Sequence, residues 1–183
     1  MSAVSPESRL TASSPERRRS AGRAIFWGWM GCGVLDITSA IIISIASGST
    51  PIRMLQGIAG AVLGPKTFEW GFATAAMGLA MHFLVALTAT LVFYALSRRI
   101  PAMVDHAVIA GILFGVFWLF VMYRGVIPLL AGVRPLYLDN VVKRPLPALW
   151  PLPILVHMTC VGLPISLAVR AFGPRPHTDR APL

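Results

Sequence analysis

Charged side chains are scarce in this chain: only 13% of its 183 residues are Asp, Glu, Lys or Arg, while 56% are hydrophobic. Soluble domains carry about 25% charged residues. Half that charge in so apolar a chain argues against a soluble globular domain and indicates a membrane protein. Acidic residues are especially few, seven against sixteen basic ones, which gives a net charge of +9.

Cysteine is rare as well. Cys32 and Cys160 both lie within apolar segments, so buried thiols that act as small hydrophobes fit them better than a disulfide framework. The sequence has no CxxC and no Cys/His cluster, which argues against a structural zinc site. It also lacks a Walker loop, paired loop carboxylates and a Ser/His/Asp arrangement in loops. We therefore predict no catalytic residues and no metal site, and an enzyme is the less favoured class.

Four long apolar segments account for most of the chain. Each has about 20 residues or more, which is enough for a helix to cross a hydrocarbon core about 30 Å thick. The sequence therefore predicts an all-α polytopic membrane protein, a bundle of four transmembrane helices within residues 23–173. The predicted spans are about 24–47, 71–96, 107–130 and 150–172.

Basic residues are distributed unevenly around these spans. Residues 1–22 are rich in Ser, Pro, Ala and Arg, which predicts a disordered basic tail, and residues 174–183 form a second short tail. If the N-terminus is cytoplasmic, ten basic residues lie on that side and six on the other. The ten are Arg9, Arg17, Arg18, Arg19, Arg23, Arg98, Arg99, Arg170, Arg175 and Arg180, and the six are Arg53, Lys66, Arg124, Arg134, Lys143 and Arg144.

This distribution predicts that both termini face the cytoplasm, because loops on that side carry an excess of Lys and Arg. The basic run at 17–19 directly precedes an apolar span and no DNA- or RNA-binding motif accompanies it. We therefore interpret the run as a cytoplasmic anchor and predict no nucleic-acid partner.

A short amphipathic segment follows the first span. Thr50 can cap a helix, and Pro51 suits the first helical position. Apolar residues then recur at helical spacing up to about residue 63. We predict a helix over about 51–63 that lies in the outer interface of the membrane as a connector.

One carboxylate lies in the middle of the first span. On a helix, the face of Asp36 consists mostly of small or polar residues, whereas the opposite face is large and apolar. A carboxylate at mid-membrane costs about 2.5–3.5 kcal/mol on insertion scales, so it needs a partner, a proton or water. His82 lies on a similar face of the second span. At the helical rise both lie about 17–18 Å from one end of their spans, so we predict that they meet inside the bundle as a buried polar pair.

Two interpretations of this pair stay open. The pair fixes the register of two helices, or it forms a proton or ligand site, since ionisable groups inside membranes often belong to relays. Two further side chains lie at a similar, shallower depth: His157 on the fourth span and Arg124 on the third, where Arg124 is expected to reach towards the outer interface. Haem held by His82 and His157 is a minor alternative; otherwise no cofactor is predicted.

Small residues mark the expected helix contacts. Gly111 and Gly115 are four residues apart on the third span, and Gly78 lies on the face of His82. Small residues at this spacing let membrane helices approach closely. Pro164 on the fourth span cannot donate to the carbonyl of Cys160, so we expect a kink there.

The stretches "GVLDITSA", "TPIRMLQGIAGAVLG", "FATAAMGLAMHFLVA" and "HMTCVGLPISLAVR" together resemble a family of uncharacterised bacterial four-helix inner-membrane proteins. The resemblance covers about residues 28–170. It implies the architecture and the location, and it implies no activity. Asp36, His82 and His157 lie in these stretches, whereas Arg124 does not.

Taken together, these features predict a small integral inner-membrane protein with a structural or accessory role. Its expected partners are the lipid bilayer and either further copies of itself or the subunits of a membrane complex. One alternative is a proton-linked transporter or channel subunit that uses Asp36 and His82. The other is a haem-binding membrane protein that uses His82 and His157.

Overall fold

The computed structural model describes residues 19–127 and 151–174, and within these ranges the chain is helical, without a strand. The greater part of both predicted tails, and residues 128–130 and 150 at the ends of predicted spans, lie outside the described residues. The helices are α1 (Ala21–Ala46), α2 (Pro51–Leu63), α3 (Gly71–Arg99), α4 (Ala102–Asp105), α5 (Ala107–Phe120), α8 (Leu152–Val156) and α9 (Leu163–Phe172). A 3₁₀ helix, η2 (Pro65–Phe68), and two π-helical segments, η3 (Val121–Val126) and η5 (His157–Gly162), connect them.

Four helical stretches are long and apolar enough to cross a membrane: Ala21–Ala46, Gly71–Arg99, Ala107–Val126 and Leu152–Phe172. The predicted fold class is therefore confirmed. The first of these helices begins three residues before the predicted start at 24, because the Ser20 side chain accepts a hydrogen bond from the amide of Arg23 and caps it. Large apolar side chains such as Phe72 and Leu84 are exposed along the helices, which indicates contact with lipid.

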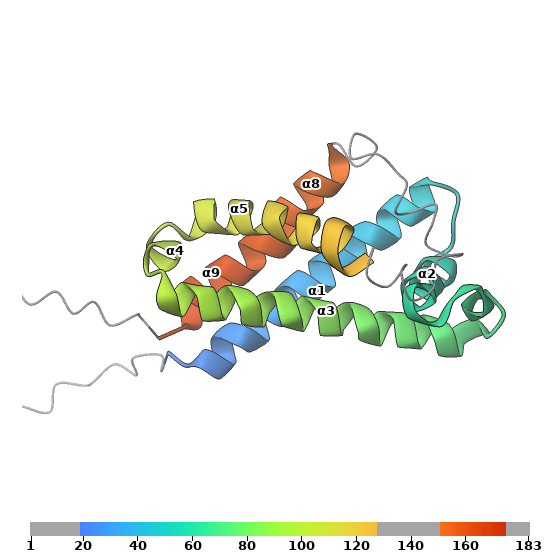
Figure 1. Cartoon of the computed structure of the whole chain (residues 1–183), viewed down its shortest axis with the longest axis horizontal. Coiled ribbons are helices and arrows are strands. Elements are labelled where there is room, and N and C mark those ends of the chain that lie inside the picture. The colour runs from blue at the N-terminus through green and yellow to red at the C-terminus, as the bar shows by residue number, and fades with distance from the viewer. Residues whose placement is uncertain (1–18, 128–150, 175–183) are drawn as a thin grey trace, which may run out of the picture.

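Both described ends of the chain lie at the same end of the bundle (Figure 1). The amide of Ser20 donates to the carbonyl of Phe172 over 2.8 Å, so the start of α1 is bonded to the end of α9. Arg98, near the end of α3, donates to the carbonyl of Pro174 over 2.8 Å. An even number of spans returns the chain to its starting side. The two bonds hold the start of α1 and the end of α3 against the C-terminal end of α9.

Glycines allow the helices to pack backbone against backbone. A Cβ atom built on Gly111 would lie 2.9 Å from the carbonyl oxygen of Gly162, and one built on Gly115 would collide with the carbonyl of His157. Helix α5 therefore crosses η5 at a distance that no larger residue permits. The core beside this crossing is filled by fully buried side chains that include Phe93 and Ile165.

Helix α2 lies across the bundle between the first and second spans. In Figure 1 it is seen nearly end-on, while the four long helices run along the picture. A Cβ on Gly78 would collide with the carbonyl of Leu55, so α2 rests on the N-terminal half of α3. The Gln56 side chain is only 4% exposed. It donates to the carbonyl of Gly71 over 2.9 Å, which fastens α2 to the start of α3.

Candidate functional site

Helices α1 and α3 turn their small-residue faces towards the interior of the bundle. On α1, Cys32 and Gly33 are buried on the side of Asp36, whereas Val34 on the opposite side is exposed. Large side chains are driven to the lipid face because the close approach of two helices leaves room only for small ones. Asp36 and His82 are therefore presented to one another by the pattern of residue sizes around them.

The two side chains come close without a direct hydrogen bond. Oδ2 of Asp36 lies 3.9 Å from Nδ1 of His82, and hydrogen bonds between nitrogen and oxygen are about 2.7–3.2 Å long. The side chain of His82 is 12% exposed and that of Asp36 is 23% exposed. The predicted buried pair is therefore a half-buried pair, and its carboxylate is the more accessible partner.

The other nitrogen of the imidazole is already bonded. Nε2 of His82 lies 2.9 Å from the carbonyl oxygen of Gly33 on α1. A carbonyl oxygen only accepts, so Nε2 carries a hydrogen and donates it. This bond fixes the orientation of the ring across the α1–α3 contact, and it leaves Nδ1 as the nitrogen that faces Asp36.

The protons on the two side chains decide whether Asp36 and His82 attract or repel one another. In a neutral imidazole with hydrogen on Nε2, Nδ1 carries a lone pair. An ionised Asp36 would then present a second acceptor to it, and two acceptors repel. One proton, placed on either Nδ1 of His82 or the carboxyl of Asp36, converts this repulsion into attraction. A pair that holds this one proton has no net charge.

The pair lies on the wall of a cavity of about 300 Å³. The cavity is lined by residues of α1, α2, α3, α5 and both π-helical segments. Its volume is at the lower end of the range of about 300–1,000 Å³ that small-molecule sites occupy. The described residues that line it are Cys32, Asp36, Ile37, Ala40, Met54, Ile58, His82, Val85, Ala86, Trp118, Met122, Tyr123, Ile127, His157 and Val161.

Both π-helical segments contribute to this cavity. Segment η3 supplies Met122 and Tyr123, and η5 supplies His157 and Val161. Pro164 follows η5 and has no amide hydrogen for the carbonyl of Cys160, so the regular hydrogen-bond ladder is interrupted at this point. π-Helical turns of this kind occur frequently at functional sites. In the fourth span, a π-helical segment precedes the proline at which the sequence predicts a kink.

His157 is held in the same manner as His82. Its Nδ1 donates to the carbonyl of Pro153, 2.9 Å away in the preceding turn. A neutral His157 therefore has its acceptor lone pair on Nε2. Each of these two histidines thus donates a hydrogen bond to a backbone carbonyl through one ring nitrogen. The other ring nitrogen of each can bind another partner.

Arg124 lies elsewhere. It is exposed on η3 and does not line the cavity, although its neighbour Tyr123 does. Sequence reasoning missed Trp118 and the two residues that α2 contributes, Met54 and Ile58. Trp118 has a sequence signal, because it is an aromatic residue five positions before Tyr123. The contribution of α2 has none, because it depends on where that helix folds.

The histidines give no argument for haem. The nitrogens left for iron are Nδ1 of His82 and Nε2 of His157, but the cavity is small for a macrocycle. Haem stays a prediction. Among the described residues, no group of three or more His, Cys, Asp or Glu side chains could hold a metal ion.

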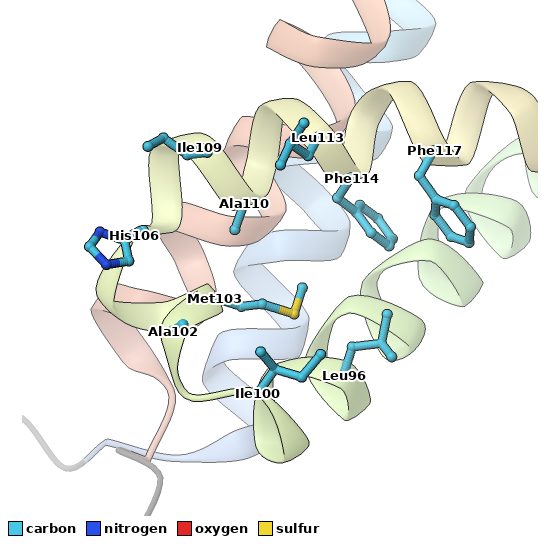
Figure 2. Close-up of a pocket in the computed structure, with 10 residues that line it drawn as sticks. All are labelled: Leu96, Ile100, Ala102, Met103, His106, Ile109, Ala110, Leu113, Phe114 and Phe117. Atoms are coloured by element: carbon cyan, nitrogen blue, oxygen red, sulfur yellow. The ribbon is translucent and has the colours of Figure 1, made fainter.

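A second hollow has a different character. Figure 2 shows a groove between the end of α3, α4 and α5, in which Met103 and Phe114 point towards the middle and His106 lies at one edge. Its volume is about 410 Å³, and its remaining lining residues are apolar. Such a surface suits contact with lipid chains and offers no set of polar groups for chemistry.

Comparisons with known proteins give no match to a protein family, to a curated protein or to a solved structure. The residues that line the cavity are therefore the basis for its function.

Proposed function

We propose that this chain is a small multi-pass protein of the bacterial inner membrane that acts as a proton-linked transporter or channel subunit. Asp36 and His82 are its proton site, and the cavity beside them is the place where a solute or water meets that site. Both termini face the cytoplasm in this proposal.

The orientation of the His82 ring supports this function most directly. Nε2 is committed to Gly33, while Nδ1 points at a carboxylate 3.9 Å away on a cavity wall. A pair that only fixed helix register would be expected to bond directly and to be shielded, because a half-satisfied polar pair inside a membrane gains little stability. Here the gap and the accessible carboxylate leave room for a proton or ligand to come and go.

The distribution of basic residues supports the orientation. Arg19, Arg98 and Arg170 lie at the end of the bundle where both termini leave it. Arg53 on α2 and Lys66 on η2 lie at the other end. The more basic side of a membrane protein faces the cytoplasm.

The small bundle supports a role as a subunit. Its helices pack closely through glycines. A cavity of about 300 Å³ is too small to form a continuous path across a hydrocarbon core about 30 Å thick. A complete path would therefore be formed by several copies or with a partner protein.

Proton movement across proteoliposomes tests the proposal. The protein is reconstituted, a potassium diffusion potential is applied, and the internal pH is followed with a dye. We expect the wild type to pass protons faster than empty liposomes, and Asp36→Asn to fall to the level of empty liposomes because its amide cannot take up a proton.

Asp105→Asn is the matched control. Asp105 is an exposed carboxylate on α4 and does not line the cavity, so this variant should behave as the wild type does. A wild type that is indistinguishable from empty liposomes would overturn the transport function and favour the structural or accessory role.

A further inference from the structure

The cavity beside Asp36 has a chemical character that defines its ligand. Resting on the proposed function, we infer that it binds a small organic cation with N–H donors, of the primary-amine class. Asp36 is the counter-ion, and the acceptor nitrogens of His82 and His157 receive the donors.

Asp36, His82 and His157 present acceptors to the cavity when they carry no extra proton, whereas the hydroxyl of Tyr123 and the thiol of Cys32, which also line it, can donate. Asp36 offers two carboxylate oxygens, His82 offers Nδ1, and His157 offers Nε2, since the other ring nitrogens donate to Gly33 and Pro153. No Lys or Arg occurs among the described residues that line the cavity. An anion would therefore meet repulsion here, and a ligand that brings donors and a positive charge would be attracted.

The remaining wall suits a short apolar body behind a charged head. Ile37, Met54 and Val85 line the cavity together with the indole of Trp118. An aromatic face attracts a cation that lies within about 6 Å of the ring centre. A volume of about 300 Å³ is enough for a small amine such as butylamine or benzylamine.

Charge balance links this ligand to the proton. The pair with one proton has no net charge, and the pair without it carries one negative charge. When an ammonium group enters, it neutralises that charge, and the proton leaves for water. One cation therefore displaces one proton at this site, which couples amine binding to proton release.

Calorimetry on the full-length protein in nanodiscs tests the inference. The probes are butylamine and benzylamine, each compared with the alcohol and the carboxylate of the same shape. We expect saturable binding of the amines, with about one proton released per amine, which is read from titrations in buffers of different ionisation enthalpy. The alcohols should bind at least about 10-fold more weakly, because a donor to a charged acceptor contributes more than a neutral one.

Variants assign the binding to Asp36. Asp36→Asn should weaken amine binding about 10- to 100-fold, Asp36→Glu should retain it because the carboxylate is kept, and Asp105→Asn should match the wild type. Size-exclusion profiles establish that each variant is folded. Equal amine affinity in the wild type and Asp36→Asn would overturn the inference, as would alcohols that bind as tightly as amines.

The two experiments separate the two proposals. If proton flux depends on Asp36 but no amine binds, the proton site stands and the ligand class is wrong. If amines bind in the Asp36-dependent manner but no proton moves across the membrane, the ligand class stands and the transport function is wrong.

Discussion

Gly111 on α5 faces Gly162 on η5 with no room for a side chain between them: a Cβ on Gly162 would collide with the carbonyl of Gly111, and a Cβ on Gly111 would lie 2.9 Å from the carbonyl oxygen of Gly162. This contact holds the third span against the fourth. It also positions His157, five residues before Gly162 in η5, at the cavity.

Gly111→Ala should therefore destabilise the protein. The added methyl group must push two backbones apart, and overpacking of this kind costs about 1–3 kcal/mol. We expect a lower midpoint of thermal unfolding in detergent. Gly57→Ala is the control, because a Cβ on Gly57 meets nothing within 4 Å and alanine favours a helix by about 0.5–1 kcal/mol over glycine. Equal midpoints for the two variants would contradict the close contact.

The spans could be predicted from the sequence because they depend on length and apolar content alone. The approach of Asp36 and His82 could be predicted as well, since a rise of about 1.5 Å per residue converts sequence position into depth. The distance between them, 3.9 Å, and the bond from His82 to Gly33 could not be predicted. They depend on the rotation of two helices about their axes, which small-residue stripes define only roughly.

The cavity could not be predicted from the sequence, for two physical reasons. First, α2 supplies Met54 and Ile58 to it, and a connector of this length carries no signal for the side on which it folds back. Second, η3 and η5 are π-helical. A π-helical turn inserts a residue, so every face assigned at 3.6 residues per turn is rotated after it. Tyr123, which lines the cavity, and the exposed Arg124 both lie in such a segment.

Gln56→Leu should loosen α2. The amide of Gln56 donates to the carbonyl of Gly71 over 2.9 Å, and a hydrogen bond of this kind contributes about 0.5–1.5 kcal/mol. Its loss should increase hydrogen exchange of the α2 amides in detergent, with little change in α1. Val62→Ala on the exposed side of α2 serves as the control. Unchanged exchange of α2 in Gln56→Leu would mean that packing against Gly78 holds this helix without the bond.

The orientation of the termini can be measured directly. A reporter that is active only in the cytoplasm, fused after residue 183, should be active, and the same reporter inserted after Gly64 should be inactive. The physical reason is the excess of basic residues at the terminal end of the bundle. The insertion site lies between α2 and η2, at the opposite end. The reverse pattern of activities would contradict the prediction and would mean that both termini lie outside the cytoplasm.

Asp36 and His82 should be coupled in a double-mutant cycle. The histidine is replaced by glutamine, because its Nε2 can keep the donor to Gly33 while the nitrogen that faces Asp36 is lost; leucine would remove both interactions. Asp36→Asn and His82→Gln should each lower the free energy of unfolding. The double variant should lose less than the sum by about 0.5–1 kcal/mol, at the low end for neighbouring residues, because the pair is partly exposed and not directly bonded.

The comparison pair for this cycle is Asp36→Asn with Gln56→Leu. Gln56 lies on α2 and bonds to Gly71 and Thr74 rather than to Asp36, so these two losses should add. Additive losses in the Asp36–His82 cycle as well would mean that the carboxylate and the imidazole do not act on one another in the membrane. The shared proton, and with it the exchange of a proton for an amine, would then lose its physical basis.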